Sequence, residues 1–304
     1  MSERITQAMT SSSTLNDINA AFTKMERSAA EMSSGKTILQ PSDNPYGASR
    51  AIDLQSQLDG LESYERAAQD GIAWTQAATS GMANIGEVMQ HVRVLVLQAS
   101  NGTLSSGDLK NIGTEISQLT ETIKQDANIQ YAGQYVFAGT ATTTPPYTQG
   151  ANDEYNGDEG TVARSVNPGS SLAINTKLSS VLGEGTASKD GKLLDTLRTI
   201  VTHLEEGTPE AKAALNSTDL AGIDSNFEAL TQLEATTGST TNQLQVALTR
   251  IESLGSSVTK ALSNTENADF AKVSIDYSNE RAAYEAALRA GASIVQESLM
   301  NFLK

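Results

Sequence analysis

Both ends of the chain carry narrow apolar stripes with the spacing of a coiled-coil seam. Within the first 33 residues, and again after residue 269, large apolar side chains recur mostly at steps of three and four positions with polar residues between them. The two stripes consist of Leu15, Ile18, Phe22, Met25, Ala29 and Met32 near the beginning, and of Phe270, Val273, Tyr277, Tyr284, Leu288, Val295, Leu299 and Phe302 near the end. A helix with such a stripe needs a partner that covers it. We therefore expect the terminal helices to pair with each other, or with the same helices of a neighbouring copy, and to serve assembly.

The first helix and the start of the second are marked by residues that favour helix ends. The first should cover residues 5–33 and stop at Gly35, because glycine readily takes the left-handed conformation that closes many helices. After a polar connector, the side chain of Asp43 or Asn44 can cap a second helix. Pro45 suits the first helical position, where no N–H is needed. The pattern therefore predicts a helix, a short connector and another helix.

The second helix is predicted to be long and to end at the Asn101-Gly102 pair. Ser105 is followed by Asp108 three positions later, which is the spacing of a capping box and predicts the start of a third helix.

The segment from residue 220 to residue 265 has the most regular heptad pattern in the chain. As an unbroken helix it would extend for about 70 Å. Its apolar register is interrupted by Glu234, Thr237, Thr241 and Gly255. Polar positions inside a heptad seam commonly set the register or a local kink, and they lower stability.

Strand and turn patterns replace the helical ones in the middle of the chain. Residues 135–139 and 171–175 are short strand candidates, and residues 161–166 alternate as a strand does. The turn sequence Asn167-Pro168-Gly169 separates two of these segments. We interpret residues 138–186 as a small β-rich insertion.

These elements predict a mainly α fold, namely an elongated, coiled-coil-like helical bundle with paired N- and C-terminal helices and a small β-rich inserted domain. We expect three parts. Residues 1–42 with 266–304 form a terminal helical domain, and residues 43–137 with 187–265 form a helical bundle. Residues 138–186 form the β-rich outer insertion.

The composition of the chain limits the kinds of partner that it can bind. The chain has 304 residues and a net charge of −15, with a pI of about 4.5, so it lacks the clustered cations that nucleic acid binding needs. It has no run of about 18 apolar residues that could span a membrane. The polar N-terminal residues do not form the apolar region of a secretory signal peptide. Cysteine is absent, which excludes disulfides, cysteine zinc ligands and thiol catalysis.

No residue pattern indicates catalysis. His91 and His203 each stand alone, without a second histidine at a metal-ligand spacing. The chain has neither a nucleophile-elbow motif nor a phosphate-binding glycine loop. We therefore expect no catalytic residues, no cofactor, no metal ligands and no enzyme activity.

Part of the acidic segment 152–159 resembles a calcium-binding loop. Asn152, Glu154, Asn156 and Gly157 match the first half of a calcium-binding EF-hand loop. The twelfth position would be Ala163, where that loop needs a bidentate glutamate. We interpret the segment as a solvated hairpin tip.

Four segments in order resemble one protein family. Residues 32–36 with 40–45 are similar to the family signature STGK…PSDDP, and residues 99–105 to its AANGTLS segment. Residues 133–139 resemble its GRYLFGG motif, and residues 267–304 its DAD…AYQAAL…SLLDFL ending. The family is the flagellin-like proteins of bacterial flagella, and the resemblance is greatest to its FlgL type, the hook–filament junction proteins. The signature positions in this chain are Gly35, Lys36, Pro41, Ser42, Asp43, Pro45, Asn101 and Gly102.

The chain departs from the family pattern in two places. Asn44 stands where a second aspartate is usual, and residues 236–242 replace a segment that normally carries charges near its glycine. Both departures lie in the helical part of the chain.

The resemblance implies a role in assembly. Terminal helices of this family line an inner tube, a second helical layer surrounds them, and a β-rich domain faces outward. Such proteins are exported without a cleaved signal peptide through the flagellar type III apparatus, with the help of a cytoplasmic chaperone, to the outside of the cell. A FlgL-type protein forms a homo-oligomeric ring between a FlgK-type hook-associated protein and the flagellin filament, and it templates filament growth.

Two other functions fit part of this pattern. The chain could be flagellin itself, the filament subunit, although its Pro-Ser-Asp-Asn-Pro signature at residues 41–45, its long polar tail after Phe270 and its small insertion disfavour this. A type III secreted tip or effector protein could share the helical hairpin, but we would not expect it to match the four ordered motifs.

Overall fold

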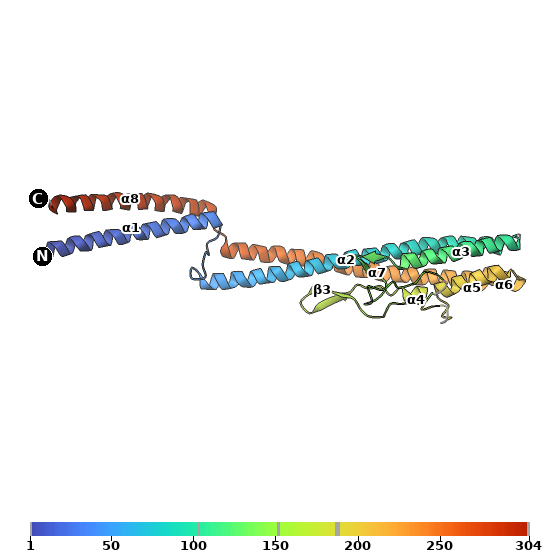
Figure 1. Ribbon diagram of the computed structural model, residues 1–304. Helices are drawn as coiled ribbons and strands as arrows, with labels where there is room; N and C mark the ends of the chain where they lie inside the picture. Colours follow the sequence, from blue (N-terminus) through green and yellow to red (C-terminus); the bar gives the residue numbers. More distant parts are fainter. Residues whose placement is uncertain (1, 102–103, 151–152, 186–188, 303–304) are drawn as a thin grey trace. The chain divides into compact units, whose positions relative to one another are not determined.

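A computed structural model describes residues 2–101, 104–150, 153–185 and 189–302, apart from the side chains of the helix ends 2–8 and 294–302. The fold is mainly α (Figure 1). The helices are α1 (Ser2–Ser34), α2 (Pro45–Ser100), α3 (Ser106–Ala127), α4 (Ser179–Leu182), α5 (Leu193–Glu206), α6 (Pro209–Ala214), the π-helical turn η1 (Leu215–Asp219), α7 (Leu220–Glu266) and α8 (Phe270–Phe302). The strands are β1 (Gln130–Tyr131), β2 (Gln134–Tyr135), β3 (Ala163–Asn167) and β4 (Ser170–Ala173). The predicted fold class is confirmed.

Contacts divide the chain into two compact units. The first comprises residues 1–60 with 254–304, and the second comprises residues 61–253. Both divisions fall within the long helices α2 and α7 rather than at helix ends. The three-part division expected from the sequence stays a prediction.

In the first unit, α1 and α8 lie side by side and antiparallel, as the paired stripes predict (Figure 1). Helix α1 ends at Ser34, and the next residue, Gly35, has a φ of 70°, the left-handed conformation expected there. Helix α2 begins at Pro45, and Asn44 is its cap, because the Asn44 Oδ1 accepts a 2.9 Å hydrogen bond from the Gly47 N–H.

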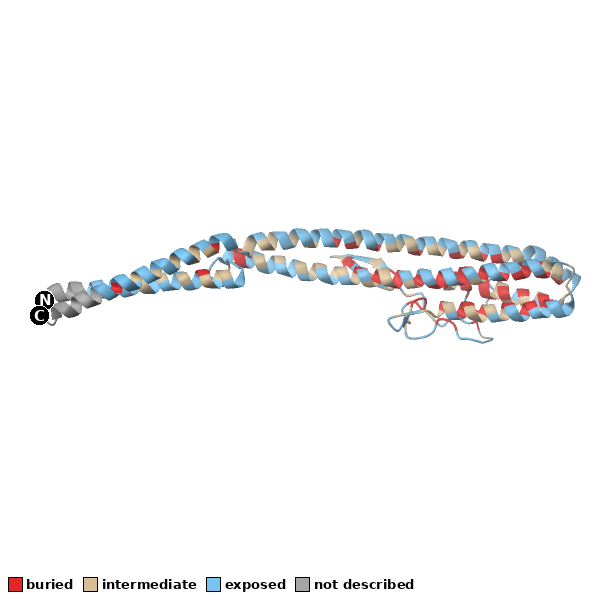
Figure 2. Ribbon diagram, turned by 90° about the horizontal axis from the view of Figure 1, so that it is seen from above, coloured by how far each residue is buried: buried red, intermediate tan, exposed pale blue. Residues whose placement is uncertain are grey.

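In the second unit, parts of α2 and α7 pack with α3 and α5 around one apolar core. Figure 2 shows buried residues concentrated on the facing sides of these helices. Trp74, Tyr147 and Phe137 are among the largest fully buried side chains. The capping box predicted for α3 is present, since the Ser105 Oγ accepts from the Asp108 N–H and the Asp108 carboxylate accepts from the Ser105 N–H.

The insertion contains less β-structure than the sequence indicates. The hairpin of β3 and β4 is present, with a bulge between Ser165 and Asn167. The strand expected at residues 135–139 is wrong beyond Tyr135, which pairs with Gln130 in the short β1–β2 ladder. Val136 and Phe137 instead turn into the apolar core, where both side chains are fully buried.

Among the described residues, no helix is long and apolar enough to cross a lipid bilayer.

Candidate assembly surface

The two apolar stripes meet each other along α1 and α8, but only in part. Val273 is buried, and Ile18, Met25, Met32, Tyr277 and Tyr284 are partly buried. Leu15, Phe22, Phe270 and Leu288 remain 59, 38, 66 and 43% exposed, respectively. The side chains of Val295, Leu299 and Phe302 lie outside the described residues. Their assignment to an interface stays a prediction.

Three contacts show how the helices pair. The rings of Phe22 and Tyr284 have centroids 5.4 Å apart and are tilted by 47°. Nearer the connector, the Ser28 Oγ donates a 2.5 Å hydrogen bond to the Glu280 Oε2. Towards the chain ends, a Cβ at Gly291 would lie only 3.0 Å from the Ile18 Cδ1, so glycine permits the helices to approach closely here.

The apolar face left open by this pairing is formed by four stripe residues, Leu15, Phe22, Phe270 and Leu288. Met9 and Ile275 are also exposed, by 68 and 61%, but they lie at helical positions away from the stripes. One partner helix therefore covers only part of the apolar surface of each terminal helix. Exposed apolar surface of this kind marks a surface that binds other proteins.

The end of α1 is joined to the end of α7 by a short antiparallel contact. The Thr37 N–H donates to the Glu266 carbonyl at 2.7 Å, and the Ala268 N–H donates to the Gly35 carbonyl at 2.8 Å. The Lys36 Nζ lies 3.0 Å from the Glu266 carboxylate. Two signature positions, Gly35 and Lys36, thus help to join the segment between α1 and α2 to the segment between α7 and α8.

The connector before α2 folds around another signature residue. The Asp43 Oδ2 accepts hydrogen bonds from the backbone N–H groups of Leu39 and Gln40, at 3.1 and 3.0 Å. The Arg27 guanidinium lies 3.4 Å from the other carboxylate oxygen of Asp43 and so attaches this turn to α1. Pro41 and Ser42 form the exposed part of the turn.

The last two signature positions follow α2 in the sequence. The Asn101 N–H donates to the Gln98 carbonyl at 3.2 Å, which closes the final turn of that helix. Gly102 lies outside the described residues.

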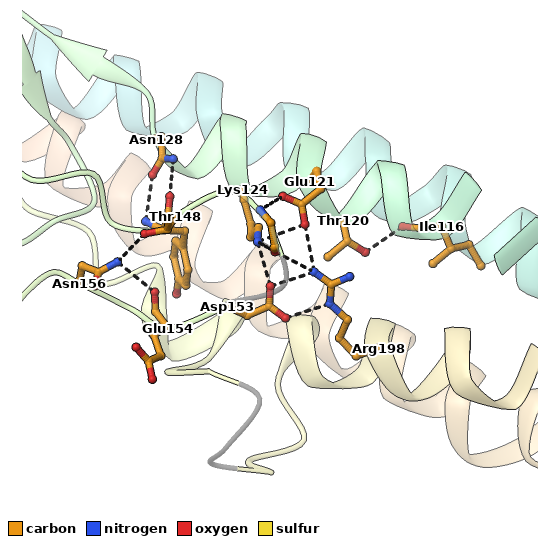
Figure 3. A network of polar contacts seen from close by, with 12 residues as sticks. Ile116, Thr120, Glu121, Lys124, Asn128, Thr148, Asp153, Glu154, Asn156 and Arg198 are labelled. Atoms are coloured by element: carbon orange, nitrogen blue, oxygen red, sulfur yellow. Dashed lines mark hydrogen bonds and ion pairs between the residues drawn. The ribbon is translucent and has the colours of Figure 1, made fainter. Parts of the chain in front are cut away.

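A buried cluster of charges attaches the insertion to the bundle, and sequence reasoning missed it (Figure 3). The Lys124 Nζ of α3 lies 2.9 Å from the Asp153 Oδ1 and 3.1 Å from the Glu121 carboxylate. The Arg198 of α5 donates to both carboxylates, at 2.9 Å to Asp153 and 3.0 Å to Glu121. The side chains of Lys124 and Asp153 are both 0% exposed. Two cations and two anions thus neutralise each other, with Lys124 and Asp153 fully buried and Arg198 and Glu121 partly exposed.

The electrostatics of this cluster favour the charged forms. Burial by itself raises the pKa of Asp153, but the hydrogen bonds from Arg198 and Lys124 outweigh it, so that the pKa lies below its ordinary value. The pKa of Glu121 is lowered in the same way against its own burial, by hydrogen bonds from the Gly150 N–H, Lys124 and Arg198.

The expectation of a solvated hairpin tip at residues 152–159 is therefore wrong for Asp153, which is buried. One pattern in the sequence could have indicated this. Lys124 lies one and two helical turns after Thr120 and Ile116 on the face of α3 that carries its apolar stripe. A lysine on an apolar stripe predicts a buried acidic partner, although it does not say which one.

A second contact anchors the hairpin of the insertion to α2. The Arg164 Nε of β3 donates to the Asp70 Oδ2 at 2.7 Å, and the Arg164 guanidinium lies 6.0 Å from the centre of the Trp74 ring. Tyr131 packs edge-on against the same ring, with centroids 6.1 Å apart.

Each histidine lies within hydrogen-bond distance of a carboxylate. The His203 Nδ1 lies 2.7 Å from the Asp219 Oδ2, and the exposed His91 lies 3.0 Å from Glu115. Among the described residues, no group of three or more histidine, cysteine, aspartate or glutamate side chains could hold a metal ion.

Comparison with known proteins now identifies the family. The model of the bacterial flagellin N-terminal helical region matches residues 5–142, and that of the C-terminal helical region matches residues 220–303. Flagellar hook-associated protein 3 of Escherichia coli is 25% identical over 295 residues, covering 90% of this chain and 91% of that protein. This chain belongs to the flagellin-like proteins, and it is of the FlgL type.

Two further comparisons concern a flagellin sequence and a solved FlgL structure. The flagellin of Bacillus subtilis is 25% identical over 318 residues, covering 99% of this chain and all of that protein. The crystal structure of Bacillus cereus FlgL has the same fold, with a TM-score of 0.57 at 20% identity. The match covers 69% of this chain and 99% of the Bacillus cereus chain. The FlgL-type chain is a structural component of the bacterial flagellum with a role at the hook–filament junction, and it is not an enzyme.

Proposed function

We propose that this chain is the adaptor that links a FlgK-type hook-associated protein to the flagellin filament and templates the first rounds of flagellin addition. The observation that carries this proposal is the apolar face left open on the paired helices α1 and α8. Leu15, Phe270 and Leu288 are exposed on that face although each belongs to a coiled-coil stripe.

The physical reason for assembly is burial of that face. Covering a large apolar side chain completely contributes about 1.5–3 kcal/mol. Neighbouring copies that present the same two helices would cover it, which yields a homo-oligomeric ring. A ring has two faces, so one face would contact the FlgK-type protein and the other would receive flagellin.

The same surface explains a need for help before export. An open apolar face would aggregate in the cytoplasm, so we expect a cytoplasmic export chaperone to cover the terminal helices. We further propose that the chain leaves the cell through the flagellar type III route without a cleaved signal peptide. Its lack of cysteine suits a chain that must stay free of disulfides until it is outside.

One observation favours flagellin as a second candidate. The match to the flagellin of Bacillus subtilis extends over nearly the whole of both chains at the same identity as the match to hook-associated protein 3. A filament subunit would use the same open face, so the fold alone does not separate the two functions.

Deleting the gene in its own bacterium separates them. We expect electron microscopy to show hooks without filaments, and immunoblots to show flagellin released into the medium. Absence of flagellin from both cells and medium would instead identify this chain as the filament subunit. Normal filaments on the deletion strain would contradict both functions.

A further inference from the structure

In the second compact unit, α2 and α7 run antiparallel, and their register is visible at several points. A Cβ at Gly71 would lie 3.2 Å from a methyl group of Leu244, and one at Gly86 would lie 3.8 Å from a methyl group of Leu230. Two leucines of α7 thus face two glycines of α2. Between these two levels, the seam between α2 and α7 is polar on its α7 side.

From Glu234 to Gln243, α7 carries no large apolar side chain. This stretch instead contributes buried hydroxyl groups to the seam. Thr75 of α2, Thr237 of α7 and Thr176 of the loop before α4 are 0, 4 and 6% exposed. Leucine side chains that interlock two helices above and below this level are replaced here by short threonine side chains.

Three hydroxyl groups in this layer, those of Thr75, Thr237 and Thr241, have more than one partner. The Thr241 Oγ1 lies 2.9 Å from the Thr75 Oγ1 and 3.0 Å from the Thr237 carbonyl of its own helix. The Thr237 Oγ1 lies 3.0 Å from the Thr176 Oγ1 and 3.0 Å from the Leu233 carbonyl. Because a hydroxyl donates only one hydrogen, Thr75, Thr237 and Thr241 each have one partner on another segment and an alternative on their own helix. The Thr75–Thr241 pair joins α2 to α7, and the Thr176–Thr237 pair joins the loop before α4 to α7.

The presence of an alternative acceptor on the same helix distinguishes threonine from the polar residues that fix coiled-coil register. A buried asparagine loses its partner when helices shift, and the unsatisfied amide penalises the shift. A threonine that loses its partner across the seam keeps its bond to the carbonyl four residues earlier. For Thr75, that alternative is the Gly71 carbonyl, at 3.1 Å.

We infer that the threonine layer formed by Thr75, Thr176, Thr237 and Thr241 is a flexible joint. At this level α2 and α7 bend or part locally with little loss of hydrogen bonding, while the leucine–glycine contacts on either side hold the unit together. Gly238 weakens the helix within the same stretch, and no atom lies within 4 Å of where its Cβ would be. Under the proposed function, which this inference uses, such a joint lets a subunit adapt to two different neighbours, the FlgK-type protein and flagellin.

The first test is hydrogen exchange of the purified full chain, read by mass spectrometry of peptides from α7. Amides of residues 233–243 should exchange about tenfold faster than those of residues 223–231 and 244–251. Equal protection along the three segments would contradict a joint at this level.

The second test fills the layer with apolar groups of the same shape. In the triple variant Thr75→Val, Thr237→Val and Thr241→Val, exchange of residues 233–243 should slow to the rate of the flanking segments and the Tm should rise. The matched control is Thr120→Val, because Thr120 is also fully buried but bonds the Ile116 carbonyl of its own helix α3. This control should leave exchange in α7 unchanged.

A fall in Tm with faster exchange in the triple variant would overturn the inference, since it would show that the hydroxyl groups fasten the helices. Both measurements use the isolated chain. Their result is therefore independent of the deletion experiment that tests the junction function.

Discussion

The Nζ of Lys124 lies 2.9 Å from the Oδ1 of Asp153, and neither side chain is exposed. This pair connects α3 to the insertion across 29 residues of sequence. Its geometry is completed by Arg198, which holds the other oxygen of the same carboxylate at 2.9 Å. The insertion is therefore attached to the bundle by charge, in a place where water does not screen the attraction.

Removing one partner of this cluster should be costly. In Lys124→Met, Asp153 stays buried with only Arg198 to neutralise it, while Glu121 competes for the same guanidinium. We expect the free energy of unfolding to fall by about 3 kcal/mol, at the lower end of the range for a broken buried pair. Urea denaturation followed by circular dichroism measures this change.

The matched control for that variant is Lys177→Met, which removes the exposed ion pair with Glu159. It should change the free energy of unfolding by less than about 0.5 kcal/mol. Equal losses of unfolding free energy in the two variants would mean that the burial of Lys124 does not increase its contribution to stability.

Acid should weaken the attachment of the insertion. The pKa of Asp153 and of Glu121 lies below the ordinary value in the folded chain. Both groups therefore stabilise the fold above their unfolded pKa values of about 4, and this contribution is lost as the pH falls through the lower folded values. Urea midpoints should be insensitive to these two groups between pH 6 and 8 and should decline below about pH 4.

The variant Asp153→Asn tests which carboxyl is responsible. It should have a lower urea midpoint than the parent at pH 7, and the two midpoints should converge towards pH 2.5. Parallel curves over the whole pH range would exclude Asp153 as a source of the acid sensitivity.

The proposed interface predicts a variant that folds but does not assemble. Phe22 is 38% exposed and lies against Tyr284 on the paired terminal helices. Phe22→Asp should leave the circular dichroism and Tm of the second unit unchanged but abolish complementation of the deletion strain, because the charge prevents burial between subunits. We expect the same of Leu299→Asp from the sequence pattern alone.

Swimming in soft agar and immunoblots of sheared filaments measure this loss. The neighbouring Thr23→Asp is the control, since Thr23 is exposed and only bonds the Asn19 carbonyl of its own helix. If Phe22→Asp is found in flagella at the level of the parent, the stripe is not the assembly interface.

The cap of α2 predicts a small and graded effect. Asn44→Ala removes the acceptor of the Gly47 N–H and should cost about 1 kcal/mol of local helix stability. Asn44→Asp restores the aspartate usual in the family and should match or exceed the parent, because a negative charge is favourable at a helix N-terminus. Hydrogen exchange of residues 46–49 measures both, and faster exchange in the aspartate variant would contradict the assignment of this cap.

Helix boundaries could be predicted from the sequence because their causes are local. Gly35 ends α1, Asn44 and Pro45 begin α2, and Ser105 with Asp108 begins α3, each through contacts within four residues. The antiparallel pairing of α1 with α8 was also predictable, since two half-apolar helices at the chain ends need covering. Three of the four ordered motifs lie at these helix ends and on the stripe of α8, and the fourth, at residues 133–139, includes β2 and the buried residues that follow it.

The insertion could not be predicted in the same way. The strand pattern at residues 135–139 was overruled because Val136 and Phe137 are more stable in the apolar core than in a ladder. The sequence alone determined the helices, their ends and the stripes that need partners. Only the tertiary structure decided that Asp153 meets Lys124 and that Thr241 meets Thr75, because each of these contacts joins residues far apart in the chain and depends on how the helices pack.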